Sequence, residues 1–188
     1  MQARKGLVRQ MPLPKRQASI KLMEQYIQDP ALRNHCLMVA QAMEAYAQQL
    51  DQDVELWFAA GLLHDLDWEQ FPDQHPQKAL DDLLDDYPDQ LKQAVAAHAP
   101  QRTQVQAESL LDRYLFACDE ICGLMNAIAL VRPNRFSDMK VKSINKKLKD
   151  KAFAANVSRE DIKQGLKLIN KEAAEHFQFL IEVFRNWS

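Results

Sequence analysis

The chain has 188 residues, of which 47% are hydrophobic and 27% are charged, and its formal net charge is −2 at pH 7. This length and composition suit a globular protein, and we expect one domain over residues 1–188. No apolar run is long enough to span a bilayer, and the basic N-terminus, MQARKGLVRQMPLPKRQ, lacks the apolar stretch of a signal peptide, so we expect a cytoplasmic protein without a membrane partner.

Helical periodicity extends over most of the chain, and only four glycines occur in it. The segment LDWEQFPDQ is expected to be a loop, and Tyr87-Pro88 and Arg132-Pro133 are expected to interrupt helices. The pattern predicts helices over residues 17–28, 30–50, 54–65, 76–86, 89–99, 105–131 and 137–150, and a last helix after Ser158.

Helix-start signals support several of these boundaries. Pro30 and Pro76 each suit a first helical position, which leaves His75 near an N-cap. Asp53 resembles the N-cap of the third helix, and Ser158 with Asp161 resembles a capping box. The sequence therefore predicts an all-α fold, a compact multi-helix bundle with its core over about residues 17–133 and a basic, helical C-terminal extension over 134–188.

Several titratable side chains fall on apolar helix faces. His35 and His98 lie in apolar stripes, His64-Asp65 ends the most apolar predicted helix, and Asp119 lies within a long apolar one. Burying such groups is costly unless they are paired or bind a metal. Taken singly, each histidine also fits a hydrogen-bonded core residue, Asp65 a helix cap, and Asp119 an ion pair with a nearby arginine. Their coincidence in one helical domain favours a metal site, since imidazole and carboxylate suit transition metals.

The order His35, His64-Asp65 and Asp119, within RNHCLMVAQAM, AAGLLHDLDW and LFACDEICGLMNAIALVRP, resembles the HD-domain superfamily of metal-dependent phosphohydrolases. The segment KVKSINKKLKDKAFAANVSRED is also similar to a bacterial HDIG-type subgroup of predicted hydrolases. The resemblance implies that all four side chains bind metal and that His64 and Asp65 are catalytic.

Two further histidines, His75 in DQHPQKA and His98 in AVAAHAP, stand where dinuclear members carry additional ligands. The similar arrangement in HD-type diadenosine tetraphosphate hydrolases implies a second ion, with Asp65 bridging the two. The alternatives are an N-cap role for His75 and a favourable helix-dipole position for His98. The expected cofactor is one or two divalent ions of Fe, Mn, Zn, Ni or Co, with Mg less suited to imidazole ligands.

The sequence departs from the family pattern in one respect. Many members place a phosphate-binding lysine a few residues after the doublet, whereas this chain continues HDLDW. The candidates to replace that lysine in substrate binding are Lys78, Arg102, Arg132, Lys142 and Lys146. The basic run KVKSINKKLKDK fits a solvated helix face equally well. The glycine-tyrosine-proline signature of cyclic-dinucleotide phosphodiesterases is absent.

The remaining side chains with possible chemistry are expected to be structural or exposed. Asp67 and Glu69 could reach the site as supporting or base groups, but they fall in the predicted loop, where solvent exposure is the simpler interpretation. The residues expected to have structural roles are Trp57, Cys118, Glu120, Cys122 and His176. The odd cysteine count does not predict a disulfide framework.

The resemblance implies hydrolysis of a phosphate ester or anhydride of a small molecule, with a nucleotide or dinucleotide polyphosphate as the leading substrate class. Nucleic acid is not an expected partner, and a homo-oligomer formed through the amphipathic C-terminal helix stays open. Two alternatives remain. One is a metal-containing sensor or binding module that contacts nucleotide or RNA through its basic segment without turnover, and the other is an interaction protein with a structural metal.

Overall fold

The computed structural model describes residues 12–187, and the basic residues 1–11 considered above lie outside this range. Every element in the described range is helical, which confirms the predicted all-α class. None of these helices is long and apolar enough to cross a membrane. The elements are α1 (Arg16–Tyr26), α2 (Pro30–Gln49), α3 (Val54–Leu63), η1 (Ala79–Leu83), α4 (Asp89–His98), α5 (Pro100–Thr103), α6 (Leu110–Leu130), α7 (Val141–Lys149), α8 (Arg159–Leu168) and α9 (Ala173–Phe184).

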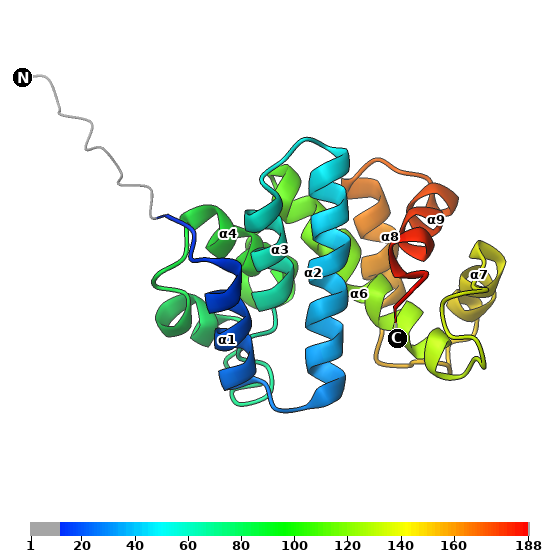
Figure 1. The fold of residues 1–188 in the computed structure, drawn as a ribbon, viewed down its shortest axis with the longest axis horizontal. Coiled ribbons are helices and arrows are strands. Elements are labelled where there is room, and N and C mark those ends of the chain that lie inside the picture. Colours follow the sequence, from blue (N-terminus) through cyan, green and yellow to red (C-terminus); the bar gives the residue numbers. More distant parts are fainter. Residues whose placement is uncertain (1–11, 188) are drawn as a thin grey trace, which may run out of the picture.

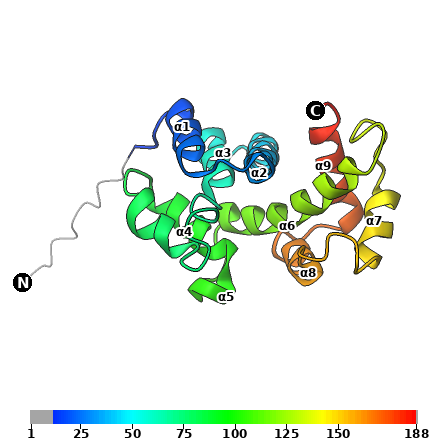
Figure 2. The ribbon, with the colours of Figure 1, turned by 90° about the horizontal axis from the view of Figure 1, so that it is seen from below.

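The long helix α6 runs through the middle of the molecule, and the other helices are arranged on either side of it (Figure 2). In Figure 1, α2 stands beside α3 near the centre, with α1 and α4 on one side and α7, α8 and α9 on the other. Helix α2 packs against α3, α6 and α9, and α6 packs against α4, α7 and α8. The two longest helices therefore connect the N-terminal half of the bundle to the C-terminal extension.

Local capping explains where the predicted helices begin. Asp29 accepts a hydrogen bond from the backbone N–H of Ala31, and Pro30 is the first residue of α2, as predicted. The Asp53 carboxylate accepts from the N–H of Leu56 and begins α3, also as predicted. In both cases the cap satisfies a backbone donor that has no partner inside the helix.

Several predicted boundaries were wrong. The long helix starts at Leu110 rather than near 105, because Ser109 and Asp112 form a complete capping box there. Pro76 precedes η1 instead of starting it. The last predicted helix is two helices, α8 and α9, and between them Asn170 has a positive φ of 50°, a conformation that ends a helix.

The proposed Ser158–Asp161 capping box is half formed. The Ser158 hydroxyl accepts from the N–H of Asp161, but the N–H of Ser158 donates to a carboxylate oxygen of Glu120 at 2.9 Å. Glu120 therefore has the structural role expected of it, and that role is a contact between α6 and the start of α8.

Two glycines allow helices to approach closely. A Cβ added to Gly61 on α3 would lie 2.8 Å from the Cα of Ala40 on α2. A Cβ added to Gly165 on α8 would lie 2.7 Å from the Cα of Ala117 on α6. Both distances are shorter than van der Waals contact, so neither helix pair tolerates a side chain at these positions without moving apart.

The C-terminal helix α9 covers the extension's side of α2. Its apolar residues Phe177, Leu180, Ile181 and Phe184 are buried within the chain. The imidazole of His176 lies between the Tyr46 hydroxyl at 2.6 Å and the carbonyl of Ala117 at 3.2 Å, and it is therefore structural, as predicted. Burial lowers its pKa to about 4. Trp57, Cys118 and Cys122 are also buried core residues, as predicted.

Candidate metal centre

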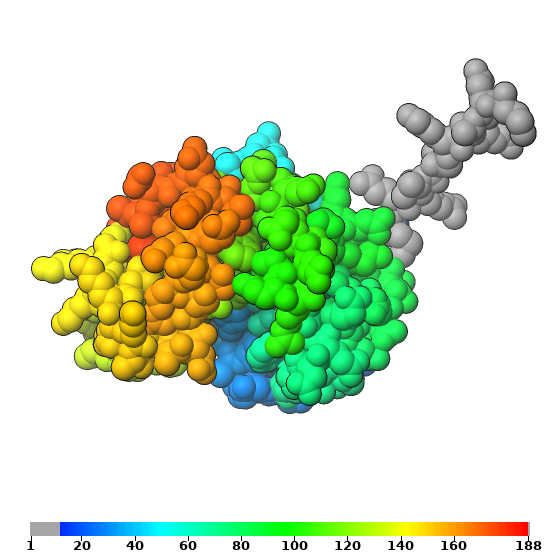
Figure 3. All heavy atoms as spheres, turned by 180° about the vertical axis from the view of Figure 1, so that it is seen from behind, coloured from blue at the N-terminus to red at the C-terminus, as the bar shows by residue number. Residues whose placement is uncertain are grey.

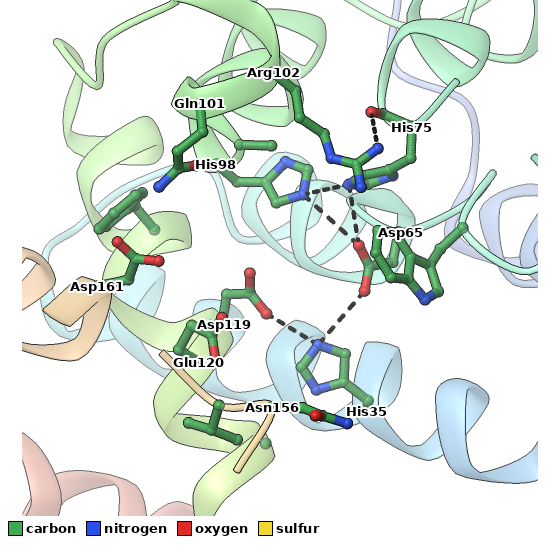
Figure 4. A pocket seen from close by; sticks show the side chains of 15 residues that line it. His35, Asp65, His75, His98, Gln101, Arg102, Asp119, Glu120, Asn156 and Asp161 are labelled. Atoms are coloured by element: carbon green, nitrogen blue, oxygen red, sulfur yellow. Dashed lines mark hydrogen bonds and ion pairs between the residues drawn. The ribbon is translucent and has the colours of Figure 1, made fainter. Parts of the chain in front are cut away.

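Six predicted ligands come from five separate segments and meet on one side of α6. His35 comes from α2, and Asp119 comes from the middle of α6. His64 and Asp65 directly follow α3, His75 lies in the loop before η1, and His98 is the last residue of α4. Figure 4 shows the five of these side chains that line the pocket, and they point toward a common space. Because the segments are far apart in sequence, the tertiary fold alone creates this cluster.

The first donor group consists of His35, His64 and Asp119. The Nε2 atom of His35 lies 3.2 Å from Nε2 of His64 and 3.0 Å from Oδ1 of Asp119. The Nε2 atom of His64 lies 3.4 Å from the same Asp119 oxygen. Three ligand atoms at these separations can surround one ion.

The second donor group consists of Asp65, His75 and His98. The Nε2 atoms of the two histidines are 3.2 Å apart, and they lie 3.6 Å and 3.7 Å from Oδ1 of Asp65. These three atoms can also hold an ion. The structure thus separates the six side chains into two groups of three.

The carboxylate of Asp65 lies between the two groups. Its Oδ1 atom faces His75 and His98, while Oδ2 lies 3.4 Å from Nε2 of His64 and 3.8 Å from Nε2 of His35. One oxygen is directed to each group, which is the arrangement required of a carboxylate that bridges two ions.

Hydrogen bonds at the other ring nitrogen orient three of the imidazoles. The Nδ1 atom of His64 is 2.8 Å from the carbonyl of Gly61, and Nδ1 of His98 is bonded to the carbonyl of Val95. The Nδ1 atom of His75 is 2.7 Å from a carboxylate oxygen of Asp67. Since these partners are acceptors, Nδ1 of each ring donates to its partner, which leaves Nε2 as the ring nitrogen that faces the cluster.

The donor set therefore fits a metal ion. The lone pairs of His75 and His98 face one another at 3.2 Å with no proton between them in the neutral rings. Two lone pairs repel at this distance, and a cation between them and Asp65 removes the repulsion. Imidazole nitrogens with carboxylate oxygens suit divalent transition metals better than Mg.

Asp67 supports the second group. It was expected to be solvent-exposed, and this expectation was wrong because the side chain is fully buried. One of its oxygens accepts from His75, and the other accepts from the backbone N–H of Ala79 at 2.8 Å. Its companion Glu69 is exposed and accepts from the backbone N–H groups of Gln28 and Asp29, away from the cluster.

The charges of the cluster shift several pKa values. Burial lowers the pKa of His64, but the carboxylates of Asp65 and Asp119 outweigh burial and hold that pKa well above its ordinary value. Conversely, burial raises the pKa of both carboxyl groups, yet the facing imidazoles lower it overall. Burial and the nearby Asp119 carboxylate raise the pKa of Glu120 to about 7. The cluster as a whole favours bound positive charge.

The two donor groups open into a cleft of about 400 Å³. Arg102 lies on the side of His75, and Glu120 with Asn156 and Asp161 of the extension lies across the cleft from it (Figure 4). The Arg102 guanidinium lies over the Trp68 ring at 5.3 Å and donates to the carbonyls of Pro72 and His75. Four carboxyl groups thus line the cleft, against one arginine and no lysine.

The five predicted phosphate-binding side chains are scattered over the molecule, and of these only Arg102 lines the cleft. Lys78 is ion-paired with Asp82 at 2.6 Å, and Arg132 is paired with Asp138 beyond the end of α6. Lys142 and Lys146 lie on α7, at the opposite end of the molecule from α4 (Figure 1). Only Arg102 is therefore placed to contact a ligand at the cluster.

Among the further residues that line the cleft, Trp68, Gln101, Asn156 and Asp161 were not assigned to the site from the sequence. The position of Trp68 three residues after Asp65 was the available signal for its proximity. No sequence signal links Asn156 or Asp161 to the cluster, because their position depends on how α8 packs against α6.

An all-α fold with two histidine–carboxylate groups at its centre defines a helical protein with a candidate dinuclear metal site. A family model of the HD domain matches residues 32–152, and the chain belongs to this family. HD-domain proteins are generally metal-dependent hydrolases. No curated protein and no solved structure matches the chain. The narrower HDIG-type assignment stays a prediction.

Proposed function

We propose that this chain is a dinuclear metal-dependent phosphohydrolase that acts on a small phosphorylated substrate, with a nucleotide or dinucleotide polyphosphate as the leading class. The observation that carries the proposal is the position of Asp65, whose two oxygens face two different groups of three donors. A mononuclear structural site has no need for a second complete donor group, whereas two-metal hydrolysis requires one.

In this proposal His35, His64 and Asp119 would hold one ion, His75 and His98 would hold the other, and Asp65 would contribute to both. When bound, such ions supply Lewis acidity to a phosphoryl group and lower the pKa of a nearby water molecule. The chain itself supplies the fixed geometry, because Gly61, Val95 and Asp67 hold three of the rings in one orientation.

Charge explains why the cations are needed for substrate binding. Asp65, Asp119, Glu120 and Asp161 all line the cleft, and Arg102 is the one lysine or arginine among its lining residues. A phosphate group would be repelled by the metal-free cleft. With two divalent ions present the sign of the potential reverses at the cluster, and Arg102 adds a donor for a phosphate oxygen on the Trp68 side.

The test combines metal content with turnover. We expect protein purified without added metal to carry close to two transition-metal ions per chain and to hydrolyse a generic phosphodiester, followed by members of a nucleotide panel. His64→Ala and Asp65→Ala should abolish turnover, whereas Asp73→Asn, at an exposed loop carboxylate, should not.

The competing functions give different results. Tight binding of a nucleotide that is never hydrolysed would indicate the sensor module. A loss of thermal stability on chelation, with no turnover of any substrate, would indicate a structural metal. Protein that binds no metal at all would refute the proposal.

A further inference from the structure

A second cavity lies in the C-terminal extension, between α7, α8 and α9. Its volume is about 830 Å³, within the usual range of about 300–1,000 Å³ for small-molecule sites. In Figure 3 the yellow residues around α7 lie next to the orange residues of α8 on this end of the molecule. None of the six candidate metal ligands lines this groove, but Val157 lines both the groove and the metal cleft.

The walls of the groove are apolar. Leu148 from α7, Ile162 and Leu166 from α8, and Phe177 from α9 line it. Ile162 is 3% exposed and Phe177 is fully buried, so the apolar surface is recessed rather than displayed on the outside. A flat surface such as a bilayer does not reach these side chains, whereas a single hydrocarbon chain that enters the groove does.

The groove is also strongly basic. Lys149, Lys151, Arg159 and Lys163 line it, and no aspartate or glutamate does. Within residues 12–187, Lys163 forms an exposed ion pair with Glu160, and the other three form none. Whereas carboxylates line the metal cleft, none lines this groove. The groove therefore attracts anions without a bound metal.

Arg159 contributes a positive charge that is held in a fixed position at the groove. Its guanidinium donates to the carbonyls of Ala154 and Val157 at 2.6 Å and 2.7 Å, and also to the carbonyls of Asp150 and Phe153. These neutral acceptors hold the side chain in place but leave its positive charge uncompensated by any carboxylate. The loop at residues 150–157 is thereby fixed as one edge of the groove.

From this arrangement we propose that the groove binds a single-chain amphiphilic anion, a fatty acid, with its tail against the apolar walls and its carboxylate at the lysines of the rim. Asn145 is the one uncharged polar side chain among the lining residues. A nucleotide base would need several such groups to be recognised, whereas a hydrocarbon chain needs none.

The experiment is calorimetric titration of the full chain with dodecanoate, below its micelle concentration. Dodecanol carries the same tail without the charge, and decanoate carries the same charge on a shorter tail. The readout is binding rather than turnover, so the result does not depend on the function proposed for the metal cleft.

Charge reversal tests the rim. The double variant Lys149→Glu/Lys151→Glu should weaken dodecanoate binding at least tenfold. The matched control Lys142→Glu/Lys146→Glu changes two exposed lysines of α7 that do not line the groove, and it should bind as the wild type does. Ala155→Trp, at an exposed lining position, should fill the groove and abolish binding, with circular dichroism to verify folding.

Tail length tests the walls. Removing two buried methylenes should weaken binding roughly tenfold, and dodecanol should bind more weakly than dodecanoate. An equal loss of dodecanoate affinity in both charge-reversal variants would overturn the proposal. Equal affinity of the wild type for decanoate and dodecanoate would overturn it as well. So would dodecanoate binding that Ala155→Trp leaves intact, or no binding at all.

Discussion

The substitution Asp67→Asn tests whether a buried carboxylate positions one specific ligand. In the wild type, one oxygen accepts from the imidazole of His75 at 2.7 Å and the other accepts from the N–H of Ala79 at 2.8 Å. Asparagine has nearly the same shape, but its amide supplies one acceptor and one donor. Either the Nδ1–H of His75 or the backbone N–H of Ala79 then faces the side-chain NH2 of asparagine and loses its hydrogen-bond acceptor.

The size of the effect follows from these two bonds. Loss of the hydrogen bond behind a metal-binding histidine lowers metal affinity about 10- to 100-fold, or about 1.4–2.7 kcal/mol. In the metal-free protein, one buried unpaired N–H lowers the free energy of unfolding by about 1–3 kcal/mol. The weakening should affect the ion at His75 and His98 and spare the ion at His35, His64 and Asp119.

The assay is stepwise competition with a chromogenic chelator, together with urea unfolding in excess chelator. Asp73→Asn, an exposed carboxylate in the same loop, is the control and should change neither quantity. If Asp67→Asn weakened both ions equally, or left both affinities unchanged, the assignment of Asp67 to one ligand would be refuted.

Three further outcomes are expected. Gly165→Ala should destabilise the protein by about 1–3 kcal/mol in urea unfolding, because the added methyl meets the backbone of Ala117 at 2.7 Å; an unchanged midpoint would contradict this close contact. The pKa of His176 is lowered in the folded state, so the unfolded chain binds the extra proton as pH falls, and about 2 kcal/mol of stability should be lost between pH 7.5 and 5. In His176→Gln, this loss of stability between pH 7.5 and 5 should be absent from urea unfolding measured across the same pH range. Arg102→Gln should raise the substrate KM about tenfold while Lys78→Gln leaves it unchanged; equal effects would remove Arg102 from substrate binding.

Local sequence determined the helices and most of their ends. The caps at Asp29 and Asp53 act between residues two or three positions apart, so short-range pattern was sufficient to find the starts of α2 and α3. The same holds for the apolar stripes that predicted a helical bundle. The boundary errors near residues 105 and 170 arose where a second cap, Ser109, or a single left-handed residue, Asn170, outweighed a continuous helical pattern.

The resemblance implied the order His35, His64-Asp65, Asp119 and a second ion at His75 and His98, but whether these side chains meet was decided by the tertiary structure. Whether His75 lies beside His98, and which oxygen of Asp65 faces each group, depends on the packing of α2, α3, α4 and α6. The same is true of the buried position of Asp67. Residues adjacent in space but far apart in the chain leave no periodic signal. The sequence therefore predicted neither the far wall of the cleft nor the basic groove, since both depend on how the extension packs against α6.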